Sequence, residues 1–186
     1  MRRDLTGRYL AAYTDASWSP VRQRGLWAFW ARDEEHRIVC SGYVPPWAQD
    51  ANDAEAAAAV AAIHVCLEQL SAAAGKILVV KTDSQTAVAW LTRGCRRPAT
   101  DAMIKTALAK LEAAQMQFSI RWVKGHNGTG TTASYLNTRV DRITKTFERR
   151  SHADTEYQLW RVPIVTGDQP KPAPVTENKS IDGWNW

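Results

Sequence analysis

The stretch KILVVKTDS, residues 76–84, decides the fold that we predict for this chain. Its first seven residues form a nearly continuous apolar run, which is typical of a strand buried on both faces of a sheet. A carboxylate, Asp83, follows the run directly. The chain therefore contains a central strand that other elements must cover on both sides.

The segments on either side of this strand predict further strands and helices. The preceding segments predict three strands, with a polar turn at 33–36, and an alanine-rich helix closed by Gly75: 8–15, 24–32, 37–44 and 53–73. The following segments predict two helices, a strand, a Gly/Thr-rich loop and a last helix: 84–93, 100–115, 117–123, 125–134 and 135–149. This order predicts an α/β domain with a mixed sheet covered by helices.

Length and composition favour one globular domain. The chain has 186 residues, of which 45% are hydrophobic and 23% charged, as in ordinary folded domains. No apolar run approaches the roughly 18–20 residues of a membrane helix, and the N-terminus lacks the apolar core of a secretion signal. Three scattered cysteines are too few for a disulfide framework. We therefore expect a cytoplasmic, monomeric protein that binds no membrane.

Charge is distributed unevenly along the chain. The net charge is +5. Residues 151–186 contain three basic and five acidic side chains, a net charge of −2, so residues 1–150 carry +7. A basic body of this kind suits a polyanionic partner such as nucleic acid.

The C-terminal part differs from the rest in composition. We divide the chain into a folded domain, residues 1–150, and an extension, residues 151–186. Within the extension, residues 162–165 can add an edge segment to the sheet, and GDQPKPAPVTENKS has the composition of a flexible linker. The tip IDGWNW, residues 181–186, either docks into an apolar pocket of a protein partner or folds back onto the domain.

Four acidic residues occupy informative positions. Asp15 ends the first predicted strand, Glu55 lies in the first turn of the long helix, and Asp83 follows the buried strand. Asp141 lies in the last predicted helix. Carboxylates that converge repel one another unless cations occupy the site. Because hard oxygen ligands suit Mg²⁺ or Mn²⁺, we expect these four residues to hold two such ions.

Each carboxylate also has an alternative explanation as a local structural residue. Glu55 fits a capping box with Asn52, and Asp83 can cap the helix that begins at residue 84. Asp15 can be a turn residue. Asp141 can be a surface charge that pairs with the basic side chain of Lys145, one helical turn later.

Five motifs in order resemble the type I ribonuclease H family. They are YTDAS, the acidic residue at the helix start, TDS, KGH and NxxxD, and they span residues 8–150. The resemblance implies an RNase H-like fold: a five-stranded mixed sheet, with three antiparallel strands then two parallel ones, flanked by helices and followed here by a flexible tail. It also implies hydrolysis of the RNA strand of RNA–DNA hybrids with two Mg²⁺ ions, for which Mn²⁺ can substitute.

The resemblance also implies roles for individual residues. Asp15, Glu55, Asp83 and Asp141 match the metal-binding carboxylates of the family. His126, in KGH, matches a mobile-loop histidine that assists proton transfer or product release. Asn52 resembles an asparagine that contacts the RNA minor groove.

The sequence departs from the family pattern at several positions. Ala16 replaces the glycine that usually follows the first aspartate, and the first of two paired asparagines before the helix glutamate is Ala51. The loop after His126 contains the insertion GTGTT, and the basic helical handle of many bacterial members is missing. These departures bear on substrate affinity more than on the metal site.

Other residues near the motifs are candidates for substrate binding. We expect contacts from side chains next to the carboxylates and from the cluster after the TDS helix: Ala16, Ser17, Asn52, Ser84, Trp90, Arg93, Arg96 and Arg97. Arg22 and Arg24 are further candidates for backbone phosphates. The alternatives are a solvated charged face for the arginines and core packing for Trp90. Trp27, Trp30 and Trp122 lie on predicted strands, and we expect them to be packing residues.

Three functions agree with these observations. The first is an endoribonuclease that cleaves RNA–DNA hybrids and leaves 5′-phosphates. The second is a divergent nuclease of the same fold that cuts another nucleic acid. The third is a non-catalytic binding module whose tail recruits a partner; the full carboxylate set favours the two enzymes.

Overall fold

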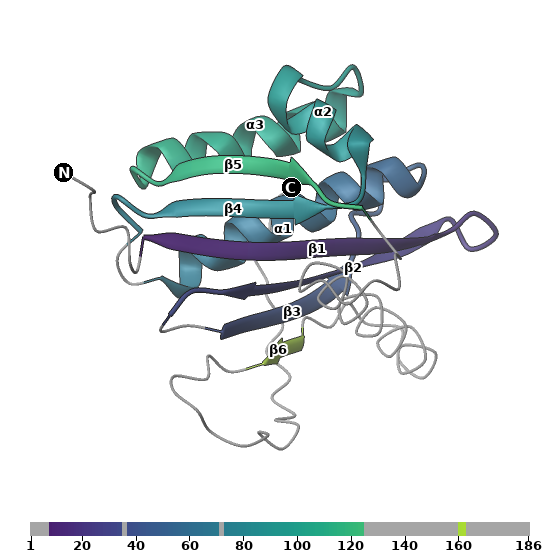
Figure 1. The fold of residues 1–186 in the computed structure, drawn as a ribbon. Helices are drawn as coiled ribbons and strands as arrows, with labels where there is room; N and C mark the ends of the chain where they lie inside the picture. Colours follow the sequence, from purple (N-terminus) through teal and green to yellow (C-terminus); the bar gives the residue numbers. More distant parts are fainter. Residues whose placement is uncertain (1–7, 35–36, 71–72, 125–159, 163–186) are drawn as a thin grey trace.

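The computed structural model describes residues 8–34, 37–70, 73–124 and 160–162, and Figure 1 shows their arrangement. Four predicted features lie outside these residues: the Gly/Thr-rich loop with His126, the last helix with Asp141, the linker 167–180 and the tip 181–186. Among the described residues, none of the helices has the length and apolar character that crossing a membrane requires.

The sheet has six strands in the order β5-β4-β1-β2-β3-β6. Their bounds are β1 Tyr9–Ser19, β2 Arg24–Arg32, β3 Arg37–Tyr43, β4 Ile77–Thr82, β5 Gln117–Trp122 and β6 Trp160–Val162. β2 pairs antiparallel with both β1 and β3, whereas β1, β4 and β5 run parallel. The predicted arrangement of three antiparallel and two parallel strands is confirmed for β1 to β5.

The helix α1, Ala51–Gln69, packs against β1 and β2 on one face of the sheet (Figure 1). Its alanine-rich sequence is buried almost all round, from Asp53 to Cys66. Small side chains on every face let the helix approach the sheet and its neighbours closely. α2, Gln85–Arg93, and α3, Pro98–Ala113, pack against α1 and the β4–β5 side of the sheet.

Two predicted helix boundaries are wrong. α1 ends at Gln69 and its C-cap is Leu70, whose N–H donates to the carbonyl of Cys66, so Gly75 does not close the helix. Gly75, with φ +76°, lies instead in the turn that leads into β4, a conformation that glycine adopts without strain. α3 begins at Pro98 rather than at residue 100, because proline suits the first helical position.

Aromatic residues fill both sides of β2. Trp27 and Phe29 belong to the large core cluster with α1, and Trp30 packs with Tyr13 on the opposite face. The packing role predicted for Trp27 and Trp30 is therefore confirmed. Trp122 was expected to pack in the same way, but its side chain is 46% exposed. That prediction is wrong, because Trp122 is the last residue of β5, which lies at one end of the strand order among the described residues.

The extension contributes the short strand β6 to the sheet. It pairs antiparallel with β3, with Cys40 opposite Arg161. The sequence predicted such an edge segment at 162–165, and the strand lies at 160–162. Backbone of the extension thus takes part in the sheet of the main domain.

We expect Gly42→Ala to destabilise the protein, because a Cβ at this position would lie 2.7 Å from Cζ2 of Trp27. The Trp27 indole is buried and its N–H donates to the Tyr43 carbonyl at 2.8 Å, so the ring cannot move away freely. Urea denaturation should show a loss of roughly 1–3 kcal/mol in unfolding free energy. Val21→Ala, at a side chain 93% exposed, is the control and should stay within about 0.5 kcal/mol of the parent. An equal effect of both substitutions would contradict this packing.

Candidate active site

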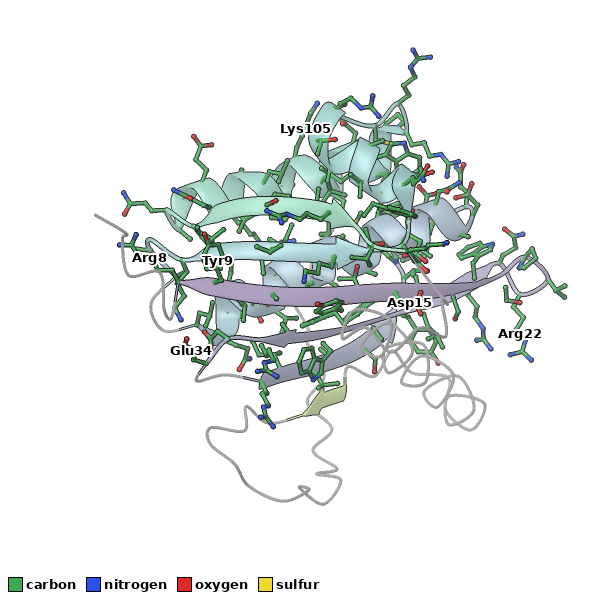
Figure 2. All side chains as sticks on the ribbon, in the orientation of Figure 1. Arg8, Tyr9, Asp15, Arg22, Glu34 and Lys105 are labelled. Atoms are coloured by element: carbon green, nitrogen blue, oxygen red, sulfur yellow. The ribbon has the colours of Figure 1, made fainter. Side chains whose placement is uncertain are left out.

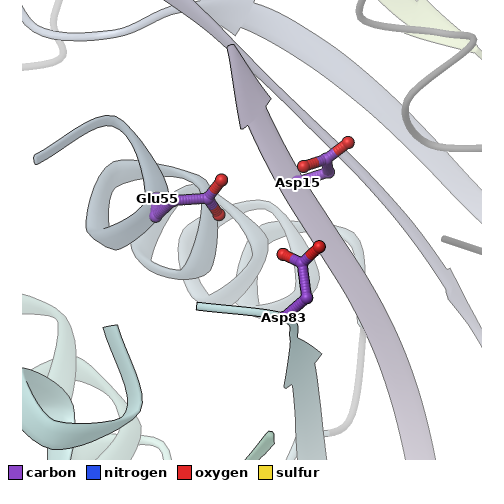
Figure 3. A group of neighbouring side chains, drawn as sticks. All are labelled: Asp15, Glu55 and Asp83. Carbon is purple, nitrogen blue, oxygen red and sulfur yellow. The ribbon is translucent and has the colours of Figure 1, made fainter. Parts of the chain in front are cut away.

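Three acidic side chains converge where β1, β4 and α1 meet. One oxygen from each of Asp15, Glu55 and Asp83 lies within 4.8 Å of the others, and Figure 3 shows the three carboxylates turned toward one another. Asp15 lies on the central strand β1, which has β4 on one side and β2 on the other. Residues that are 40 and 28 positions apart in the sequence are thus brought to one point.

Local structure excludes the alternative explanations for these three residues. β1 continues past Asp15 to Ser19, so Asp15 neither ends the strand nor occupies a turn. Asp50 caps α1 in place of Asn52, which leaves Glu55 outside a capping box. Ser84 caps α2, since its hydroxyl accepts the N–H of Ala87 at 3.1 Å.

The backbone of Ala16 joins two of the carboxylates. Its N–H donates to Oδ1 of Asp15 at 3.0 Å and to Oε1 of Glu55 at 3.3 Å. Its side chain packs against the core cluster. Alanine in place of the family's glycine is therefore accommodated here, and the residue contributes to the site through its N–H.

Glu55 carries the electrostatic cost of this arrangement. Burial, followed by repulsion from Asp15 and Asp83, raises its pKa to about 9, and the Ala16 N–H opposes this only in part. Its Oε2 is buried and has no hydrogen-bond partner among the described residues. A divalent cation would supply the missing partner and offset the repulsion. The residues therefore fit a hard metal ion.

The sequence and the fold together identify the family. The RNase H family model matches residues 8–148. The chain belongs to the RNase H family. Its resemblance to this family, expected from the motifs, is confirmed, as is the RNase H-like fold.

Solved structures share this fold at low sequence identity. LC11-RNase H1, isolated from compost by a metagenomic approach, has 12% identity and a TM-score of 0.57, with 78% of this chain and 99% of that chain covered. RNase H1 from the halophilic archaeon Halobacterium salinarum has 18% identity and a TM-score of 0.56, with 76% and 98% covered. LC11-RNase H1 in complex with an RNA/DNA hybrid has 14% identity and a TM-score of 0.57, with 74% and 94% covered. A comparison with curated proteins finds no significant match.

Of the other site residues predicted from the resemblance and the neighbouring motifs, some lie among the described residues and some outside them. His126 and Asp141 lie outside the described residues. Asn52 is half-buried in the first turn of α1, and Ser84 is half-buried at the start of α2. Their proposed contacts with substrate stay predictions.

The β1–β2 hairpin carries two of the predicted basic residues. Arg22 and Arg24 are exposed and line a small pocket with Ser17 and Tyr43. Figure 2 shows Arg22 at the hairpin end of the strand that carries Asp15. A phosphate contact from this hairpin stays a prediction.

The four candidates after Asp83 separate into two pairs. Arg93 and Arg96 are exposed. Trp90 is half-buried, packs against the core cluster, and lies under the guanidinium of Arg97 at 5.1 Å from the ring centroid. Arg97 also bonds to the carboxylates of Asp50 and Asp53. The structure gives Trp90 and Arg97 packing and ion-pair partners, and their contact with substrate stays a prediction.

Trp122 is a neighbour of the site that sequence analysis missed. Its indole N–H donates to the backbone carbonyl of Asp83 at 3.0 Å. Trp122 pairs with Thr82 across the parallel strands β4 and β5, and this register places it next to Asp83. The sequence signal for this contact is the parallel alignment of two strand ends, KT at 81–82 and RW at 121–122, which places Trp122 opposite Thr82.

We expect the pH dependence of metal-free stability to reveal the buried carboxyl of Glu55. Its pKa rises from 4.5 to about 9 on folding, so the folded state binds the proton more tightly. The resulting stability is fully present below about pH 4.5 and is lost as pH rises toward 9. In urea denaturation with chelator present, Glu55→Gln should therefore have a larger unfolding free energy than the parent at pH 8. The difference in unfolding free energy between the two proteins should become smaller toward pH 5. A difference that does not change with pH would contradict this environment for Glu55.

Proposed function

We propose that this protein is a metal-dependent endoribonuclease that hydrolyses the RNA strand of RNA–DNA hybrids. The observation that carries the proposal is the cluster of Asp15, Glu55 and Asp83, in which the buried Oε2 of Glu55 has no hydrogen-bond partner within the part of the chain that the structure describes. Membership in the RNase H family supports nuclease chemistry for such a cluster.

The carboxylates have distinct places in this proposal. Asp15, Glu55 and Asp83 would hold Mg²⁺ ions together with Asp141, with Asp15 on the central strand of the sheet. When bound, such ions lower the pKa of a water and stabilise the leaving 3′ oxygen of a phosphodiester, so that the products carry 5′-phosphates. The N–H of Ala16 donates to both Asp15 and Glu55 and so fixes these two carboxylates relative to each other. His126 would move a proton, because imidazole is the side chain whose ordinary pKa lies near neutral pH.

The choice of an RNA–DNA hybrid rests on three supports. The body of the chain is basic, as phosphate binding requires. Arg93 and Arg96 are exposed on and after α2, the helix that follows Asp83. LC11-RNase H1, which shares the fold, has been solved with an RNA/DNA hybrid.

We expect Asp15→Asn and Asp83→Asn each to lower hybrid cleavage by at least about 100-fold, because each removes a ligand charge from the metal site. The assay uses a labelled RNA–DNA hybrid with Mg²⁺, with Mn²⁺ or with chelator, beside matched RNA and DNA duplexes. Asp101→Asn, at a carboxylate on α3 that pairs with Lys105, is the matched control and should retain cleavage.

Two results would count against the proposal. Cleavage at the parent rate by both cluster variants would show that these residues are not the metal ligands. Preferential cleavage of an RNA or DNA duplex would favour the divergent nuclease instead.

A further inference from the structure

Arg97 is the centre of an ion-pair network beside the carboxylate cluster. Its Nη1 donates to Oδ1 of Asp50 at 2.9 Å and to Oδ2 of Asp53 at 2.7 Å, and its Nη2 donates to Oδ2 of Asp50 at 2.7 Å. The plane of the guanidinium lies over the Trp90 ring. One side chain thus joins the start of α1 to α2 and to the loop between α2 and α3.

The backbone holds Arg97 in place for these contacts. Its N–H donates to Sγ of Cys95 at 3.3 Å, and its carbonyl accepts the N–H of Asp101 at 2.8 Å. Arg97 is the N-cap of α3, directly before Pro98. Because the guanidinium group of arginine is planar and rigid, little side-chain freedom is lost when it binds two carboxylates.

The two acidic partners fix the first turn of α1. Oδ1 of Asp50 accepts the backbone N–H groups of Asn52 and Asp53 at 2.9 and 3.1 Å. Asp53 is 1% exposed, and its carboxylate also accepts the hydroxyl of Thr100 at 2.7 Å and the N–H of Gln49 at 2.9 Å. The hydrogen bond from Arg97 is the main reason that the pKa of Asp50 falls to about 2. The ion pair of Asp50 with Arg97 therefore stays charged at neutral pH.

The helices that Arg97 joins also position two residues of the carboxylate cluster. Glu55 belongs to α1, whose start Arg97 binds, and Asp83 precedes α2, on whose Trp90 Arg97 packs. Repulsion among the three carboxylates favours separation of α1 from the β4–α2 junction. Arg97 opposes that separation, because it binds α1 and packs on α2.

We propose that Arg97 is a positioning residue for the metal site, which sets the placement of Glu55 relative to Asp83 and thereby the affinity for divalent cations. The inference rests on the proposed function, because it concerns the same carboxylates. It is distinct from the contact with substrate phosphates predicted from sequence, since it rests on the bonds from both terminal nitrogens of Arg97 to carboxylates.

The test compares divalent-cation binding by four full-length proteins without nucleic acid. They are the parent, Arg97→Met, the double variant Arg97→Met with Asp53→Asn, and Lys105→Met. The double variant removes the buried charge that Arg97→Met leaves unpaired, so it should fold even where the single variant does not. Lys105 pairs with Asp101 on α3 and is 74% exposed, so its replacement removes a nearby cation that does not contact α1.

Mn²⁺ binding is measured by titration calorimetry, thermal unfolding checks the folded state, and KM for a hybrid is measured in parallel. We expect Mn²⁺ affinity to fall about 10-fold or more in both Arg97 variants and to match the parent in Lys105→Met. Parent-like Mn²⁺ affinity in the folded double variant would overturn the inference, as would a raised KM with unchanged Mn²⁺ affinity, which indicates substrate contact. If the parent itself neither binds Mn²⁺ nor cleaves the hybrid, the proposed function fails and the inference fails with it.

Discussion

Mutual repulsion of three carboxylates is the constraint that organises this part of the molecule. Asp15, Glu55 and Asp83 are held within reach of one shared ion by a strand, a helix and a strand end. Without a cation, a cluster of three carboxylates is unfavourable. Burial and repulsion from Asp15 and Asp83 accordingly raise the pKa of Glu55. The three carboxylates stay together because the surrounding sheet and helices are packed tightly enough to oppose their repulsion. Such locally unfavourable arrangements are common at functional sites.

The resistance comes from an unusual helix. α1 presents alanine on nearly every face, and its residues from Asp53 to Cys66 are buried between the sheet and α2 and α3. A helix with larger side chains would stand further from β1. The close approach brings Glu55 to the N–H of Ala16, so the composition of the helix is directly connected to the geometry of the site.

Most of the fold and three of the four carboxylates could be predicted from the sequence. The apolar run before Asp83 predicted the central parallel strand, because a strand buried on both faces leaves such a run. The β-rich segments 24–32 and 37–44, with the polar turn between them, predicted the hairpin. The end of the first strand was misplaced at Asp15. A carboxylate inside a strand resembles a strand end when only the sequence is known, since nothing local shows that other residues converge on it.

The partners of single side chains could not be predicted from the sequence, for one physical reason. The sequence shows that Arg97 is basic, but its partners Asp50 and Asp53 lie more than forty residues away. The same holds for Trp122, whose contact with Asp83 follows from the alignment of two parallel strands. Charge and hydrophobicity are local properties, whereas the partner that decides a side chain's role is set by tertiary structure.

The pairing of β6 with β3 has a consequence for the edge of the sheet. An open strand edge offers unpaired N–H and C=O groups that a second molecule can bind. Residues 160–162 occupy part of that edge on β3 and so shield backbone groups from edge-to-edge association. Shortening the protein to residues 1–150 would uncover these groups, even with every acidic residue of the cluster left in place.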